Sequence, residues 1–158
     1  MHRVRLPHLL RPLHPAHPLQ RARHRGWIEY ASTCLNDIAA LYAAEAPTFP
    51  TKLATLTARL SRLEGEVQGP YFAPNLSLVD AAFGPVFRYF EVFQMLDLPD
   101  CMPDTPQLTR WRQELQSRPS VAAAVGTDYP ERLAAFLRAR SSHLGDGARA
   151  SQNLRSPT

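Results

Sequence analysis

Ser77 and Asp80 are the residues whose types and spacing come closest to a chemical pair. A hydroxyl near a carboxylate could take part in acid/base chemistry. The spacing Ser-x-x-Asp is also that of a capping box, in which Ser77 accepts a hydrogen bond from the N–H of Asp80 and the carboxylate accepts one from the N–H of Ser77. Because an apolar run follows directly, we interpret the pair as a helix cap and predict no catalytic residue in this chain.

The histidines and cysteines form no convincing metal or nucleophile site. His14 and His17 have a spacing that a metal could use, but a proline lies between them and arginines surround them, so we predict no bound metal. Cys34 and Cys101 belong to no Cys-x-x-Cys or Cys/His pattern, and we interpret both as buried thiols.

One basic segment has aromatic residues interleaved with it. Arginines at 21, 23 and 25 precede Trp27 and Tyr30, and Arg23, Trp27 and Tyr30 recur at helical spacing. Residues 1–25 hold six arginines and no acidic residue, whereas residues 26–158 hold 12 basic and 14 acidic residues. The net charge of +4 therefore resides in a short arm, and we predict no nucleic-acid partner.

The elements that must position these residues read as helices throughout. With 158 residues, 44% of them apolar and 20% charged, the chain fits one globular domain. No alternating β-branched run predicts a strand, so the predicted fold is an all-α bundle of about five to six helices. We expect an extended Pro/His/Arg-rich arm at 1–18, a helical domain at 19–143 and a disordered tail at 144–158. The predicted helices span 19–45, 51–67, 77–96 and 105–117. A last helix should have Pro130 in its first turn and bury Leu133, Phe136 and Leu137. Thr51 is the predicted cap of the second helix.

The helix that starts at Ser77 is predicted to be central and buried. Its first three turns have almost no polar face, and Pro85 inside it should kink the helix and leave the carbonyl of Ala81 without its intrahelical donor. As a lost cap, Asp80→Ala should destabilise the fold by about 1–2 kcal/mol.

Targeting signals are weak. The first 20 residues contain four prolines and no long apolar run, so we expect no secretory signal, and no window is apolar enough for a membrane span. We expect a cytoplasmic location. The acid-free start also resembles a transit peptide in composition, although it is poor in serine.

Lys52 is the only lysine among 18 basic residues, a bias that indicates a GC-rich bacterial genome.

Three ordered motifs resemble the all-helical C-terminal domain of cytosolic glutathione S-transferases. They are PLHPAHPLQRARHRGWIEYAS at 12–32, GPYFAPNLSLVDAAFGPVFRYF at 69–90 and LTRWRQELQSRPSVAAAV at 108–125. The resemblance covers about residues 12–140. The start MHRVRLPHLLR does not match the end of the thioredoxin-like domain that precedes this region in the family.

The resemblance implies a function that depends on a second domain. In the family, the thioredoxin-like domain binds glutathione and supplies the residue that stabilises its thiolate, whereas the helical domain contributes one wall of the electrophile pocket and part of the dimer surface. This sequence has no βαβ pattern, so we expect the chain alone to be inactive and to hold no cofactor, glutathione being the co-substrate of the intact family. Arg23, Trp27 and Tyr30 would be its substrate-binding or dimer-contact residues.

The expected partners are a second copy, a thioredoxin-like domain or an electrophilic small molecule. A different class of function also stays open, namely a non-catalytic helical module for protein–protein interaction.

Overall fold

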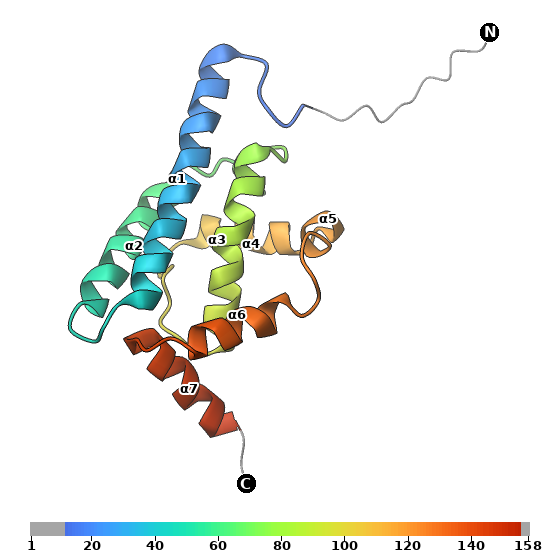
Figure 1. Cartoon of the computed structure of the whole chain (residues 1–158). Helices are drawn as coiled ribbons and strands as arrows, with labels where there is room; N and C mark the ends of the chain where they lie inside the picture. The colour runs from blue at the N-terminus through green and yellow to red at the C-terminus, as the bar shows by residue number, and fades with distance from the viewer. Residues whose placement is uncertain (1–11, 156–158) are drawn as a thin grey trace.

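The computed structural model describes residues 12–155, and within that range every regular element is a helix (Figure 1). The predicted all-α class is therefore confirmed, with seven helices in the described range where about five to six were expected. The helices are α1 Pro18–Ala43, α2 Phe49–Glu64, α3 Leu78–Met95, α4 Pro106–Gln116, α5 Pro119–Ala122, α6 Tyr129–Arg138 and α7 His143–Arg155. The first 11 residues of the predicted arm lie outside the described residues.

Helices α1 and α2 form an antiparallel hairpin, and α1 also packs against α3 (Figure 1). The second helix begins earlier than predicted. Its N-cap is Thr48 and Pro50 lies in its first turn, so the choice of Thr51 as cap was wrong. A proline in the first turn loses no hydrogen bond, because that N–H has no intrahelical acceptor.

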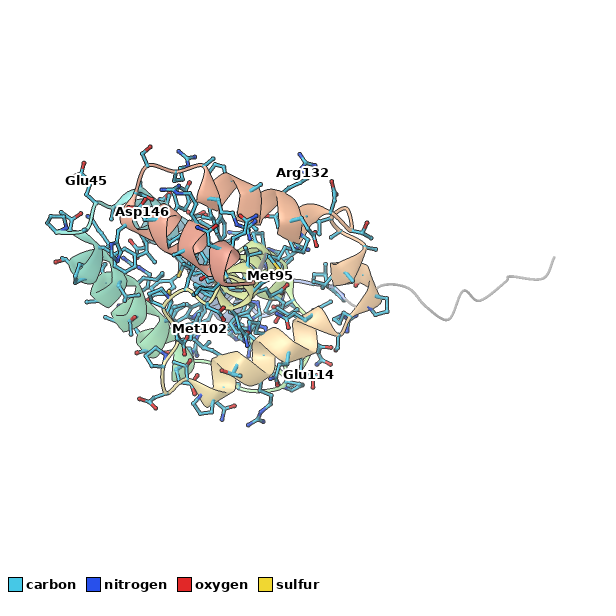
Figure 2. The ribbon with its side chains drawn as sticks, turned by 90° about the horizontal axis from the view of Figure 1, so that it is seen from below. Glu45, Met95, Met102, Glu114, Arg132 and Asp146 are labelled. Atoms are coloured by element: carbon cyan, nitrogen blue, oxygen red, sulfur yellow. The ribbon has the colours of Figure 1, made fainter. Side chains whose placement is uncertain are left out.

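Helix α3 is central: it packs against α1, α4 and α6, and in the view from below α2, α4 and α6 surround it (Figure 2). Of the charged residues labelled in that view, Glu45, Glu114 and Arg132 lie at the periphery, and Asp146 lies on the exposed surface of α7. The core-facing side chains of α3 are fully or almost fully buried: Val79, Asp80, Phe83, Val86, Phe87, Phe90, Val92 and Phe93. This burial fits the long apolar run of the sequence.

The start of α3 contains both halves of the capping box at Ser77 and Asp80. The backbone N–H and the hydroxyl of Ser77 both donate to Oδ2 of Asp80, at 2.6 and 2.8 Å. The other carboxylate oxygen, Oδ1, accepts from the N–H of Phe72 at 2.9 Å and from the indole N–H of Trp111 at 2.7 Å. Asp80 is therefore a cap and also a cross-link between α3, the loop before it and α4.

The start of α4 is satisfied from another helix. Both carboxylate oxygens of Glu64, at the end of α2, accept hydrogen bonds from the backbone N–H groups of Gln107 and Leu108, each at 2.8 Å. Such a carboxylate neutralises the partial positive charge of a helix N-terminus. The sequence did not reveal this contact, because its partners are more than 40 residues apart.

The region after His143 differs from the prediction. Residues expected to be a disordered tail form α7 as far as Arg155, with Leu144 and Ala148 buried against the rest of the molecule. Two buried side chains, four positions apart on one helix face, are enough to dock the segment, although its composition is polar. The His143 N–H also donates to the carbonyl of Ala44, at the end of α1.

The sixth helix buries Leu133 and Leu137 as predicted, but Phe136 is on the outer side with 36% of its surface exposed. Its ring packs edge-on to Tyr42, at 5.4 Å between centroids, and the guanidinium of Arg140 lies 4.1 Å from its centroid. The expected burial of Phe136 was wrong because neighbouring positions 136 and 137 point about 100° apart on a helix.

Candidate functional site

A cleft of about 310 Å³ lies between the segment before α1, the first turns of α1 and the loop that leads into α3. Arg23 and His24 line it from α1, Leu13 from the N-terminal segment, and Glu66 and Phe72 from the loop. The N-terminal segment is fixed in place because the N–H of Leu78 donates to the carbonyl of Leu13 at 3.1 Å.

Arg21 holds the same segment from the side of α1. Its guanidinium donates to the carbonyls of Pro15 and Ala16, at 3.2 and 3.3 Å. The end of the predicted arm is thus tied to the helix that follows it, and one side of the cleft is built by local backbone contacts.

Arg23 is the one residue of the predicted substrate-binding set that lines this cleft. Its guanidinium forms an ion pair with Glu66, and the two side chains are 52% and 33% exposed. An exposed ion pair contributes little to stability, about 0–1 kcal/mol. A ligand with an anionic group could therefore take over Arg23 at little cost to the fold.

His24 forms the apolar side of the cleft together with Phe72. The two rings meet edge-to-face with centroids 5.8 Å apart. Burial lowers the pKa of His24, the electrostatic influence of His14 and Arg23 lowers it further, and Asp80 acts in the opposite direction. The Nδ1 atoms of His14 and His24 are buried and have no hydrogen-bond partner in the described part of the chain, so His24 is neutral near pH 7.

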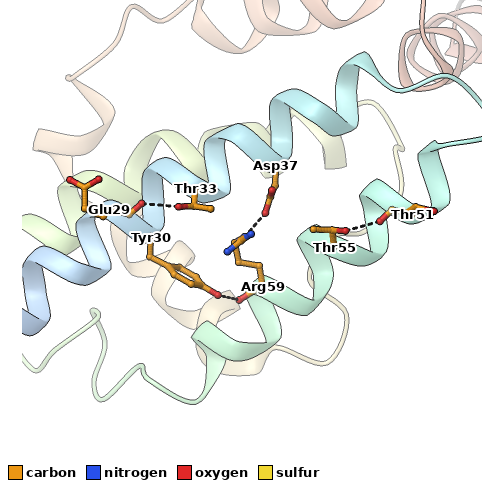
Figure 3. A network of polar contacts seen from close by, with 7 residues as sticks. All are labelled: Glu29, Tyr30, Thr33, Asp37, Thr51, Thr55 and Arg59. Carbon is orange, nitrogen blue, oxygen red and sulfur yellow. Dashed lines mark hydrogen bonds and ion pairs between the residues drawn. The ribbon is translucent and has the colours of Figure 1, made fainter.

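Tyr30 faces α2, and Trp27 packs between Tyr30 and the loop before α3. The hydroxyl of Tyr30 donates to the carbonyl of Arg59 at 3.0 Å, and Arg59 pairs with Asp37 on α1 (Figure 3). The ring of Trp27 contacts those of Tyr30 and Phe72, with centroids 4.9 and 5.7 Å apart. Neither residue is in the lining of the cleft, and their substrate-binding role stays a prediction.

The other groups that could carry chemistry are the two cysteines and the side chains that could bind a metal ion. Burial raises the pKa of both Cys34 and Cys101 to about 12, so neither thiol ionises near neutral pH. Among residues 12–155, no three His, Cys, Asp or Glu side chains converge as metal ligands. No helix within the same range is long and apolar enough to cross a membrane.

Two of the cleft residues, His24 and Phe72, were not found from the sequence. His24 is three residues before Trp27 and so shares its helix face, a signal that was available. Phe72 reaches the cleft only because the loop 65–77 folds back on α1, and its spacing from α1 does not reveal this contact. As built, the cleft has an apolar side, a neutral imidazole and one arginine, which suits binding of a flat apolar group more than bond-breaking.

No family model and no curated protein sequence matches this chain. Among solved structures, the chain is similar to the crystal structure of glutathione transferase Omega 3C from Trametes versicolor, with a TM-score of 0.70 and 23% sequence identity. The similarity covers 83% of this chain and 58% of that chain, so the chain spans less than two thirds of that protein. The helical fold of residues 12–155 is the fold of the glutathione transferase C-terminal domain.

Proposed function

We propose that this chain supplies the helical part of a glutathione-transferase-like protein, whose complete form conjugates glutathione through its thiol sulfur to an electrophilic small molecule. The observation that carries the proposal is the fold similarity over 83% of the chain. In this function a thioredoxin-like domain, joined to the chain or separate from it, holds glutathione. Location in the cytoplasm and association with a second copy are parts of the same proposal.

The chain's own part in the reaction is to bind the electrophile in the cleft beside α1. The aromatic side formed by Phe72 and His24 would receive the flat apolar body of the molecule. Arg23 would exchange Glu66 for an electron-rich substituent, such as a nitro group or a carboxylate. Trp27 supports this side through its contact with Phe72, and Tyr30 supports Trp27, so we assign these two residues a positioning role.

The first test is a pair of calorimetric titrations of the chain by itself. We expect no binding of glutathione, and weak binding of an aromatic electrophile analogue such as dinitrobenzoate. Micromolar binding of glutathione by the chain alone would contradict the proposal, because it would require a glutathione site within these helices.

The second test joins the chain to a thioredoxin-like domain and measures conjugation of glutathione to chlorodinitrobenzene. Arg23→Gln should raise the KM for the electrophile, whereas Arg25→Gln, on the same helix but outside the cleft lining, should not. Equal KM values for the two variants would remove Arg23 from the site. Absence of any conjugation by the joined protein would favour the alternative function, a non-catalytic interaction module.

A further inference from the structure

A second hollow, of about 270 Å³, lies beside the first half of α3, on the side that faces α5. Its walls combine α3, α5 and the N-terminal segment, and they are mostly apolar. The residues that line it are Leu13, Leu76, Ser77, Asp80, Ala81, Gly84, Pro85, Arg88, Leu115, Ser120, Val121 and Ala124. It shares Leu13, Leu76 and Ser77 with the cleft beside α1, but Arg23, His24 and Phe72 are not part of it. We call it the α3–α5 pocket.

Gly84 and Pro85 open this pocket. A Cβ atom placed on Gly84 would have no neighbouring atom within 4 Å, so the space above this residue is empty rather than filled by packing. Pro85 has no N–H, and the carbonyl of Ala81 therefore lacks the donor that a helix normally provides four residues on. Ala81 and Pro85 both line the pocket, so the residue that carries this acceptor is part of its wall.

Arg88 lies one turn after Gly84 and lines both the α3–α5 pocket and a neighbouring hollow of about 330 Å³, which Val121 and Tyr129 also line. Its guanidinium donates to the carbonyl of Val121 at 2.9 Å and lies 5.9 Å from the ring centroid of Tyr129. Arg88 takes part in none of the ion pairs found in the described range. The only carboxylate in the lining is that of Asp80, and it accepts its own four hydrogen bonds inside the fold.

We propose that the α3–α5 pocket binds a small aromatic carboxylate that also carries a hydroxyl or amine. The ring would lie over Gly84, the carboxylate would pair with Arg88, and the hydroxyl or amine would donate to the carbonyl of Ala81. Pockets for drug-sized ligands measure roughly 300–1,000 Å³, so this volume suits a ligand of one or two rings. The site adjoins the electrophile cleft at Leu13, Leu76 and Ser77, but its proposed ligand contacts are different and the proposal does not depend on the transferase function.

The test uses a hydroxynaphthoate as the probe and the matching hydroxynaphthamide as its neutral control, both titrated by calorimetry into the full chain. We expect saturable binding of the carboxylate at one site. The amide should bind at least about tenfold more weakly, because a hydrogen-bonded charge pair typically contributes this factor or more.

Two pairs of variants locate the site. Gly84→Leu should fill the pocket and remove binding. Gly26→Leu, on α1, should bind the probe like the wild type; a Cβ atom meets nothing within 4 Å at either position. Arg88→Gln should weaken binding of the carboxylate about tenfold or more and leave binding of the amide unchanged. Arg132→Gln, on the exposed side of α6, is its control.

Ala124→Phe closes the same pocket from the α5 side and replaces Gly84→Leu if that variant does not fold, as judged from its thermal unfolding. Loss of binding in either pocket-filling variant, with binding kept in Gly26→Leu, supports the assignment. The assignment is overturned if the wild type shows no saturable binding of the probe up to millimolar concentration. It is also overturned if a folded pocket-filling variant binds the probe as well as the wild type.

Discussion

Asp80 gives the sharpest test of how this fold is held together. Replacement by alanine leaves three buried N–H donors without an acceptor, those of Phe72, Ser77 and the Trp111 indole. Each unsatisfied buried donor costs about 1–3 kcal/mol, which gives roughly 3–9 kcal/mol in total. Removal of a buried carboxylate recovers part of its desolvation cost, so we expect about 4–5 kcal/mol.

This value exceeds the 1–2 kcal/mol expected for a lost cap alone, because the carboxylate also joins α3 to α4 and to the preceding loop. Asp80→Asn should be milder, at about 1–3 kcal/mol. Its amide oxygen can still accept from Phe72 and Trp111, while its NH₂ group faces the N–H of Ser77. Ser77→Ala removes one hydroxyl and keeps every acceptor of Asp80, so it should cost only about 1 kcal/mol.

The assay is urea unfolding followed by far-UV circular dichroism, with the free energy of unfolding extrapolated to water. Trp111→Phe, alone and combined with Asp80→Ala, measures the coupling across the indole hydrogen bond. We expect the two substitutions to be less than additive by about 1 kcal/mol or more, since the pair shares one bond. Equal costs for Asp80→Ala and Ser77→Ala, or full additivity with Trp111→Phe, would refute the view of Asp80 as a cross-link.

The remaining predictions concern three other parts of the fold. The folded-state pKa of His24 lies below its ordinary value of 6.5. The contribution of His24 to stability is therefore present above pH 6.5 and is lost as the pH falls through the folded-state pKa. Thermal unfolding at a series of pH values should show that His24→Phe flattens this dependence. Cys34 and Cys101, with pKa values raised to about 12, should react with a thiol reagent at neutral pH only at the rate of unfolding, and a fast native phase would show that one of them is accessible. Gly145→Ala should lower the melting temperature strongly, because its Cβ would lie 2.1 Å from the carbonyl oxygen of Arg140. Gly147→Ala should leave the melting temperature nearly unchanged, because the nearest atom to its Cβ is 3.4 Å away. Equal melting temperatures for the two variants would indicate that the segment is a disordered tail.

Helical spacing explains why the sequence identified only part of the candidate site. Arg23 was found because it shares a helix face with two aromatic residues, and it does line the cleft. The same reasoning favoured Trp27 and Tyr30, but helical spacing specifies only a shared face. It does not tell whether that face meets a cleft or another helix, and for these two residues it meets α2 and the loop before α3.

The sequence by itself determined the features that depend on neighbouring residues. The box at Ser77 and Asp80, the prolines that begin helices and the apolar run of α3 act within one or two turns, so their spacing is sufficient to predict them. The tertiary structure alone decided the contacts between distant segments. Asp80 accepts a hydrogen bond from Trp111, Glu64 accepts hydrogen bonds from the start of α4, and Leu144 and Ala148 pack α7 against the rest of the molecule. These groups meet because separate helices pack together, and no short-range pattern in the sequence encodes that packing.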